Sequence, residues 1–160
     1  METSPKCSKE VFHMNLTFSN QKQFSSQQVN NLYTSVKWTG YTNDLPKLLR
    51  AISKSDLVIS AWNGEELVGL IRAVTDEETV AYIQDILVFP AYNKQGVGSQ
   101  LMRRMLAELK GIRQIVLMTD QGEASLPLHD WYRSFGFKPY EDWGTIGFAI
   151  FDVEEAEANL

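Results

Sequence analysis

At 160 residues, with 44% hydrophobic and 22% charged residues, the chain has the size and composition of one soluble domain that needs no disulfide or metal. Its net charge of −5 disfavours a general nucleic-acid binder and suits a cationic partner. The single cysteine, Cys7, excludes an internal disulfide and fits a reducing, cytoplasmic location. No apolar run reaches membrane-spanning length, and His13 and His129 are too isolated to indicate a metal site.

The first half of the chain predicts a strand followed by two helices. Residues 11–18 alternate as a strand does, and residues 1–10 are expected to be a loose tail. Ser25 begins a helix that ends before Gly40, and Asp44 begins a second one. The apolar faces of these two helices carry Val29, Leu32, Tyr33 and Val36, and Leu45, Leu48, Leu49 and Ile52.

Three strands are predicted next, at residues 57–62, 67–74 and 79–89. The dipeptide Asn63-Gly64 is a strong hairpin signal, and an acidic turn begins at Asp76. This part of the chain is therefore expected to be antiparallel.

The second half predicts a change to helix and strand. An amphipathic helix follows Gly98 and stops at Gly111, and the strand expected at residues 112–119 should run parallel to the one before it. A further helix begins at Ser125, with Pro127 in its first turn. Strands at 137–143 and 145–151 are expected to close the sheet as a hairpin, and residues 152–160 to be a loose tail. The elements predict a single domain of α/β (α+β) class, with a mostly antiparallel seven-stranded sheet and about four helices.

The loop between the strand predicted at residues 79–89 and the helix that follows Gly98 is a candidate phosphate site. Gly96 and Gly98 can leave the first amides of the helix unshielded, and Lys94 adds a positive charge. A glycine pair is also an ordinary helix cap, so this motif alone is not decisive. A mononucleotide loop is absent. A dinucleotide fingerprint would need glycine where Leu101 stands, although Asp120 lies at a suitable distance, and it is kept as the weaker alternative.

Two motifs, together with the order of the predicted strands and helices, resemble the GCN5-related N-acetyltransferase (GNAT) family. The resemblance covers about residues 11–151. The family's glycine loop, Gln/Arg-x-x-Gly-x-Gly/Ala, is similar to Asn93-Lys94-Gln95-Gly96-Val97-Gly98, with asparagine at the first position. An aromatic-Tyr-x-x-x-Gly-Phe run is similar to Trp131-Tyr132-Arg133-Ser134-Phe135-Gly136-Phe137. The preceding Asp85-Ile86-Leu87-Val88-Phe89-Pro90 resembles the same segment in plant arylalkylamine acetyltransferases.

The resemblance implies an acetyl-coenzyme A-dependent enzyme that acetylates a primary amine of a small molecule, or of a peptide, by direct attack in a ternary complex. It places the cofactor's pyrophosphate on the glycine loop and its pantetheine arm along the preceding strand, whose parallel neighbour must splay away. The residues expected at the cofactor are Ile86, Leu87, Val88, Lys94, Gln95, Gly96, Val97, Gly98 and Ser99.

Two residues are the catalytic candidates. By strand alternation Asp85 shares a face with Ala81, Ile83 and Leu87, where a carboxylate is costly unless it has a task or a partner. We expect it to take the amine's proton, and the alternative is a carboxylate paired with an arginine or with backbone amides. The resemblance makes Tyr132 the donor to the leaving thiolate, and packing in the core is the alternative.

The sequence says less about the acceptor site and the partners than about the cofactor site. Tyr33, Trp38 and Tyr41 are expected either to line the amine site through cation–π attraction or to form the core of the first helix. A homodimer is compatible with the family, and neither nucleic acid nor a membrane is expected as a partner. A different class of function, a non-catalytic acyl-coenzyme A sensor, would use the same loop.

Overall fold

The computed structural model describes residues 15–151, which form two compact units, one ending at Met118 and one beginning at Thr119. The two expected tails, and the start of the strand predicted at residues 11–18, lie outside this range. None of the helices in residues 15–151 has the length and apolar character that a membrane crossing requires.

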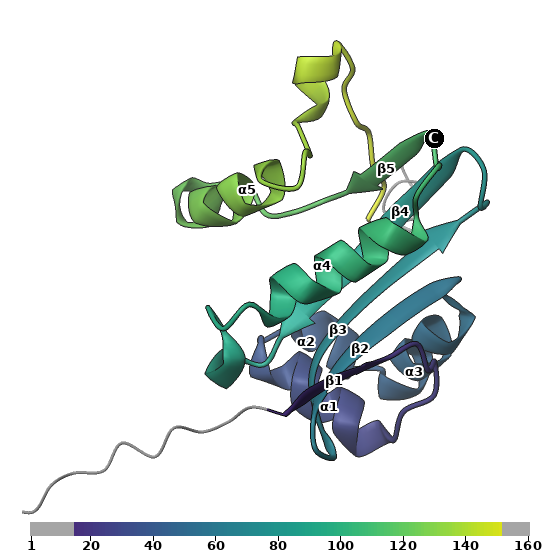
Figure 1. Cartoon of the computed structure of the whole chain (residues 1–160), viewed down its shortest axis with the longest axis vertical. Coiled ribbons are helices and arrows are strands. Elements are labelled where there is room, and N and C mark those ends of the chain that lie inside the picture. Colours follow the sequence, from purple (N-terminus) through teal and green to yellow (C-terminus); the bar gives the residue numbers. More distant parts are fainter. Residues whose placement is uncertain (1–14, 152–160) are drawn as a thin grey trace, which may run out of the picture. The chain divides into compact units, whose positions relative to one another are not determined.

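The first unit is built on a five-stranded sheet in the order β1-β2-β3-β4-β5 (Figure 1). Its strands are β1 (Leu16–Ser19), β2 (Leu57–Asn63), β3 (Glu66–Thr75), β4 (Val80–Val88) and β5 (Gln114–Leu117). Neighbours from β1 to β4 pair antiparallel, whereas β4 and β5 pair parallel, as the sequence predicts.

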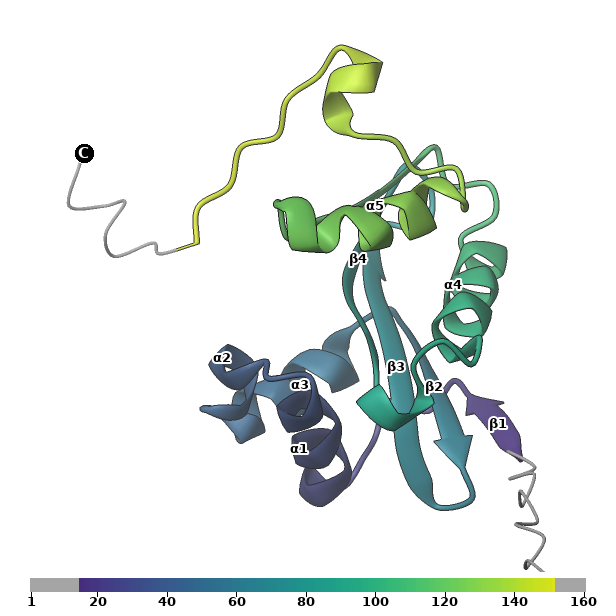
Figure 2. The ribbon, with the colours of Figure 1, turned by 90° about the vertical axis from the view of Figure 1, so that its left-hand side faces the viewer.

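Helices cover both faces of this sheet (Figure 2). One face carries α1 (Ser26–Ser35), α2 (Thr39–Thr42) and α3 (Leu45–Lys54), and the other carries α4 (Val97–Glu108). The predicted caps are confirmed: Ser25 and Gln28 form a capping box, and the Asp44 carboxylate accepts from the amide of Lys47 at 3.0 Å. The single turn of α2 was not predicted, because four residues are too few to show helical periodicity.

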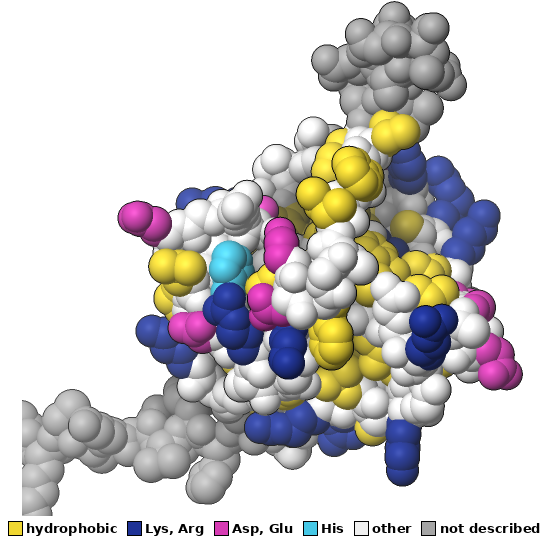
Figure 3. All heavy atoms as spheres, turned by 90° about the horizontal axis from the view of Figure 1, so that it is seen from above, with side chains coloured by type: hydrophobic (Ala, Val, Ile, Leu, Met, Phe, Trp, Pro, Cys, Tyr) yellow, Lys and Arg dark blue, Asp and Glu magenta, His cyan; other side chains and the backbone are white. Residues whose placement is uncertain are grey.

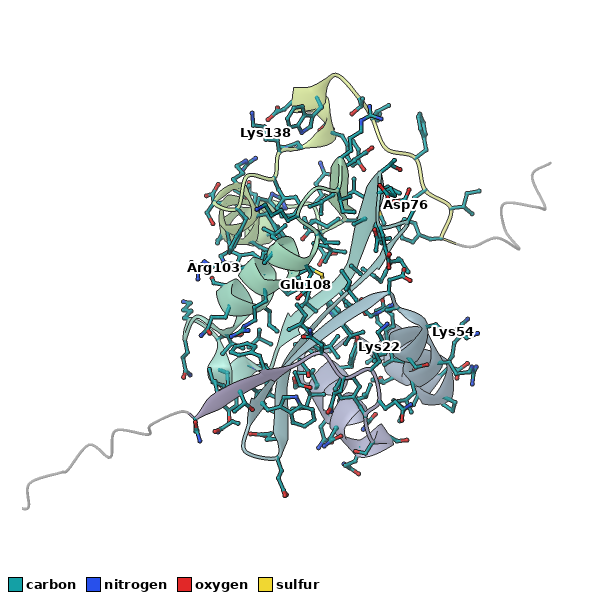
Figure 4. The ribbon with its side chains drawn as sticks, turned by 45° about the vertical axis from the view of Figure 1, so that its right-hand side comes forward. Lys22, Lys54, Asp76, Arg103, Glu108 and Lys138 are labelled. Carbon is teal, nitrogen blue, oxygen red and sulfur yellow. The ribbon has the colours of Figure 1, made fainter. Side chains whose placement is uncertain are left out.

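The core on the α1–α3 face joins these helices to the middle strands. Its buried members are Val29, Leu32, Tyr33, Leu48, Ile52, Val58, Leu67, Leu70 and Leu87. On the other face Val97 and Leu101 of α4 pack directly over Gly69 of β3. Arg103, on the outer side of α4, faces solvent (Figure 4). The apolar stripes predicted for these helices are therefore confirmed.

The turns between the antiparallel strands follow local chemistry. The β2–β3 hairpin forms as predicted, with Asn63 paired to Glu66 and with Gly64 at φ +59° in the two-residue turn. In the β3–β4 turn the carboxylate of Asp76 accepts from the amides of Glu78, Thr79 and Val80 at 2.8–3.0 Å (Figure 4). The Thr79 hydroxyl also donates to it and has the largest effect, and together these bonds hold the pKa of the Asp76 carboxyl below its usual value.

A β-bulge changes the face on which Asp85 lies. Arg72 pairs with Asp85, while the next residue, Ala73, pairs with Ile83, so Gln84 is the extra residue. Directly paired residues share a face, so Asp85 lies on the α1–α3 face and Ile83 on the other. The predicted common face of Asp85 with Leu87 is confirmed, but that with Ile83 and Ala81 is wrong, because simple alternation does not survive a bulge.

The second unit contains α5 (Leu126–Arg133) between two 3₁₀ turns, η2 (Glu123–Ser125) and η3 (Tyr140–Trp143). The first unit also has one such turn, η1 (Pro90–Tyr92). Ser125 stands at the N-cap of α5 but makes no side-chain cap, so the predicted capping bond is absent.

The predicted hairpin at residues 137–143 and 145–151 does not form in the described chain. Residues 140–143 are the turn η3, and residues 144–150 contain no strand. The apolar side chains of that last segment are exposed, with Phe148 92% accessible, and hydrophobic side chains are visible at the surface in Figure 3. The sheet therefore has five strands in the described residues instead of the seven predicted. Alternation in a sequence shows that a segment can be a strand, but a strand also needs a partner for its backbone groups.

Candidate functional site

The glycine loop between β4 and α4 presents the open N-terminus of a helix. Gly96 is the N-cap residue, and in the described chain no side chain caps this helix. The first backbone bond of the helix runs from the amide of Gln100 to the carbonyl of Gly96, at 3.0 Å. The amides of Val97 and Gly98 therefore lack helical partners and, with the helix dipole, favour an anion.

Backbone conformation keeps this loop open. Lys94 and Gly96 both have positive φ, +60° and +81°. A Cβ built on Gly96 would meet no atom within 4 Å, so the surface beside it is free for a ligand. The Gln95 side chain donates to the carbonyl of Ala91 at 2.7 Å and ties the loop to the preceding turn. The loop thus leaves open space beside its amides, and phosphate binding there stays a prediction of the sequence.

The parallel pairing of β4 with β5 covers only the first part of β4. Its register starts at Val80 with Gln114 and ends at Ile83 with Leu117. β4 continues for five more residues to Val88, and after the bulge residue Gln84 it stays paired to β3 on its other edge. Within the described residues, the β5-facing edge of residues 84–88 has no strand partner. Backbone groups there are available to an extended, amide-bearing ligand.

Asp85 lies at the centre of a buried polar network. Its side chain is 1% exposed, and its Oδ2 accepts from the Nε of Arg72 and from the hydroxyl of Tyr33, the latter at 2.9 Å. Its Oδ1 accepts from the hydroxyl of Tyr41, also at 2.9 Å. Arg72 is held in turn by the hydroxyl of Ser55 at 3.2 Å from Nη1. The arginine partner that the sequence left as an alternative is therefore present.

Burial and charge shift the pKa values of this network. Burial raises the pKa of the Tyr33 hydroxyl well above its usual value, and the charge of Asp85 adds to the effect. The pKa of Tyr41 is raised by the same two causes. Burial lowers the pKa of Arg72 and is the largest single effect, but the charge and hydrogen bond of Asp85 and the nearby Tyr33 and Tyr41 together raise it more, so the net shift is upward. Arg72 is therefore a permanent cation, and both phenols are neutral at physiological pH.

The three aromatic residues form one cluster with unequal exposure. Ring centroids lie 5.5 Å apart for Tyr33 and Tyr41, 6.0 Å for Tyr33 and Trp38, and 5.9 Å for Trp38 and Tyr41. Tyr33 is fully buried, whereas Trp38 and Tyr41 are half-buried. Tyr33 thus belongs to the core, and its two neighbours can face a ligand. The Tyr41 hydroxyl also accepts from the side chain of Gln84 at 2.8 Å.

Tyr132 is the buried centre of the second unit. It is 8% exposed and packs edge-on against Trp131 and Phe137, at centroid distances of 5.0 and 6.1 Å. Burial raises the pKa of its hydroxyl, a hydrogen bond with Thr119 lowers it, and the charge of Asp120 raises it. The hydroxyl therefore stays protonated at physiological pH and can act as a donor.

Sequence reasoning missed Arg72 and Gln84. Arg72 interrupts a run of otherwise apolar residues on β3, and an arginine at such a position needs a carboxylate, which was an available signal. Gln84 carried no such signal in the sequence, because its contact with Tyr41 depends on the bulge. Across residues 15–151, His, Cys, Asp and Glu side chains form no group of three that could hold a metal ion.

Comparison with known proteins supports the interpretation of the motifs. The model of the acetyltransferase (GNAT) family matches residues 26–137. An uncharacterised ycf52-like N-acetyltransferase from Prochlorococcus marinus is 29% identical over 126 residues, covering 75% of this chain and 66% of that protein. The chain therefore spans slightly less than two thirds of that relative's length.

Solved structures show the same fold. A GNAT-family acetyltransferase from Streptococcus pneumoniae is 32% identical, with a TM-score of 0.73, covering 86% of this chain and 98% of that one. A GNAT-family acetyltransferase from Brucella melitensis, solved in complex with acetyl-CoA, is 24% identical with a TM-score of 0.59, and covers 80% and 86%. The latter likeness concerns the fold alone.

Proposed function

Since this chain belongs to the acetyltransferase (GNAT) family, we propose that it transfers the acetyl group of acetyl-coenzyme A to a primary amine of a small molecule, or of a peptide, in a ternary complex. One observation carries the proposal. An uncapped helix N-terminus follows, after the turn η1 and the glycine loop, a strand whose last five residues have no parallel partner among the described residues. Acetyl-coenzyme A combines the two features that such a site recognises, a pyrophosphate and a long arm of amides.

The chain's own residues fit this cofactor in two places. The amides of residues 95–99 would bind the pyrophosphate, with Lys94 beside them as a counter-charge. The backbone of Ile86, Leu87 and Val88 would pair with the pantetheine amides, and one of these N–H groups would stabilise the negative charge that develops on the thioester oxygen. The cofactor supplies an activated acetyl group, and no metal is needed for these contacts.

The acceptor must lose a proton before it can attack. An alkyl ammonium group has a pKa of about 10.4, so most of it is protonated near neutral pH. Asp85 is the proposed final acceptor of that proton, and Tyr132 is the proposed donor to the leaving sulfur. Trp38 and Tyr41 would contact the body of the amine.

A second function, a non-catalytic sensor of acyl-coenzyme A, is favoured by one observation. Asp85 already accepts from Arg72, Tyr33 and Tyr41, as a structural carboxylate would. A sensor would bind acyl-coenzyme A through the same loop but would not catalyse acetyl transfer.

A panel of amines distinguishes the two functions. The purified chain is mixed with acetyl-coenzyme A and putrescine, 2-phenylethylamine, an aminoglycoside, an amino acid or a lysyl peptide, and free thiol is measured. The enzyme predicts thiol release with at least one amine. Thermal stabilisation by acetyl-coenzyme A, with no thiol release from any amine, would instead establish the sensor.

A further inference from the structure

We propose that the attacking nitrogen of the acceptor contacts the hydroxyl of Tyr41, which passes the nitrogen's proton to Asp85, while Arg72 positions that carboxylate. This inference rests on the proposed acetyl transfer and names the group that touches the acceptor. Tyr41 is then a catalytic residue, and Arg72 and Asp85 act through it.

Direct contact between the acceptor and Asp85 does not fit its surroundings. Its side chain is 1% exposed, and both of its oxygens already accept hydrogen bonds. Oδ2 is shared by Arg72 and Tyr33, two groups that are themselves buried. Oδ1 accepts only from Tyr41 and keeps one lone pair, but a side chain that is 1% exposed offers an amine from solvent almost no access to it. The route to Asp85 therefore passes through a partner that is accessible.

Tyr41 is that partner. It is half-buried, whereas Tyr33 is fully buried and Arg72 is 8% exposed. Its hydroxyl donates to Oδ1 of Asp85 at 2.9 Å and accepts from Gln84 at 2.8 Å. A hydroxyl oxygen has two lone pairs, so one is left for an N–H of the acceptor. The hydroxyl is thus arranged to receive a proton on one side and to release one on the other.

The Tyr41 hydroxyl contacts β4 at the point where the pairing of β4 with β5 ends. Ile83 is the last β4 residue paired to β5, and Gln84, which holds the Tyr41 hydroxyl, is the next one. The unpaired residues 86–88, proposed to hold the thioester, follow within the same strand. An acceptor nitrogen on Tyr41 would therefore lie near the carbonyl carbon that it attacks.

The transfer of atoms balances. One N–H proton of the ammonium group moves to the Tyr41 oxygen while the Tyr41 proton moves to Oδ1 of Asp85, which leaves a neutral tyrosine, a carboxylic acid and a nitrogen lone pair. That lone pair forms the bond to the acetyl carbon, and the carbon–sulfur bond breaks with its electrons on sulfur. Of the two protons left on nitrogen, one stays in the amide, and the other replaces the proton that the sulfur receives from its proposed donor, Tyr132. Asp85 then releases its proton to solvent by the reverse path.

Tyr41→Phe and Tyr33→Phe provide a matched test. Each removes one hydroxyl that donates to the same carboxylate over 2.9 Å, and each keeps the aromatic ring. With the amine that releases thiol fastest in the panel, Tyr41→Phe should lower kcat/KM about 100-fold or more, the scale of general-base catalysis. The loss from Tyr33→Phe should be at least tenfold smaller, and both variants should keep their affinity for acetyl-coenzyme A.

The pH profile adds a readout that a structural role would not change. The titratable groups facing Asp85 are Tyr33 from α1, Tyr41 from α2 and Arg72 from β3. Without Tyr41, turnover depends on free amine from solution, so the deficit of Tyr41→Phe should shrink as pH rises toward about 10.

Two results would overturn the inference, and they are separable. Equal losses from the two variants, or a Tyr41→Phe deficit that does not change with pH, would contradict the relay while the acetyl transfer stands. Wild-type protein that binds acetyl-coenzyme A but releases no thiol with any amine would contradict the proposed function, and the relay with it.

Discussion

The buried pair of Arg72 and Asp85 is the residue-scale feature on which the first unit depends most. Removing one partner leaves a charge uncompensated in the core, which costs about 3–5 kcal/mol, whereas an exposed pair contributes about 0–1 kcal/mol. We therefore expect Arg72→Met to lower the free energy of unfolding, measured in urea, by about 3–5 kcal/mol. Arg133→Met breaks the exposed pair with Asp130 and is the matched control, with a loss below about 1 kcal/mol.

A double variant identifies the cause of that loss. Arg72→Met combined with Asp85→Leu removes both charges, so part of the lost stability should return. If Arg72→Met costs no more than Arg133→Met, or if the double variant is less stable than Arg72→Met alone, the desolvated charge is not what destabilises the protein.

The hydroxyl of Tyr132 gives a second prediction at this scale. If it donates to the leaving sulfur, Tyr132→Phe should lower kcat about tenfold or more while the affinity for acetyl-coenzyme A changes little. Tyr140→Phe, in the same unit, is the control and should keep its turnover. A normal rate for Tyr132→Phe would mean that this residue only packs among the neighbouring aromatic rings.

Single residues were predictable where their chemistry is local. Ser25 and Asp44 cap their helices because the cap is decided within three residues. Asp85 was recognised as unusual because burying a carboxylate in an apolar strand is costly unless it has a partner or a functional role. Its partner Arg72 lies on another strand, in a register that depends on a bulge, and the sequence does not reveal that register.

At the scale of elements, the contact between α4 and β3 depends on the absence of a side chain at Gly69. A Cβ there would lie 3.0 Å from Leu101 Cδ1, 3.3 Å from Val97 Cγ1 and 3.3 Å from the carbonyl oxygen of Leu87. The carbonyl belongs to the backbone of β4 and cannot rotate away, so the new methyl group would have to push the side chains of α4 outward, and such overpacking costs about 1–3 kcal/mol. We expect Gly69→Ala to lower the free energy of unfolding by that amount.

Gly40 supplies the matched control for this contact. It lies in α2, and a Cβ there would meet no atom within 4 Å. Gly40→Ala should therefore be neutral, or stabilise by up to about 1 kcal/mol through the unfolded chain. Equal unfolding free energies for the two variants would show that α4 does not pack closely on Gly69.

The sequence predicted elements well and their partners less well. The helix joining β4 to β5 required a parallel pair, which the register confirms. That register ends before β4 does, and the opening of the pair beside the glycine loop stays a prediction. The last predicted hairpin does not form in the described chain. The alternation at residues 145–151 shows that the segment could be a strand, but it does not show which strand it would pair with. Its exposed Ile146, Phe148 and Ile150 show that apolar periodicity alone does not determine burial.

For the whole molecule, the raised pKa of Tyr33 predicts how stability depends on pH. In the unfolded chain a tyrosine ionises near pH 10, whereas burial and the charge of Asp85 keep folded Tyr33 protonated to higher pH. The unfolded state therefore loses a proton that the folded state retains, so stability is complete below about pH 10 and falls as pH rises through the folded pKa. Unfolding free energies measured from about pH 8 to 11 should fall less steeply for Tyr33→Phe, and identical slopes would contradict this.

The central claim is that the N-terminus of α4, beside the opened edge of β4, binds the phosphates of acetyl-coenzyme A. Gly96 and Gly111 flank α4 at opposite ends, both have left-handed φ, and a Cβ added to either would meet no atom within 4 Å, so replacing either with glutamate introduces the same strain and charge. The direct test is calorimetric titration of wild type, Gly96→Glu and Gly111→Glu with acetyl-coenzyme A. We predict that wild type and Gly111→Glu bind and that Gly96→Glu loses at least about 100-fold in affinity, from like-charge repulsion at a phosphate site. Equal affinity in both variants, or no binding by the wild type, would contradict the claim.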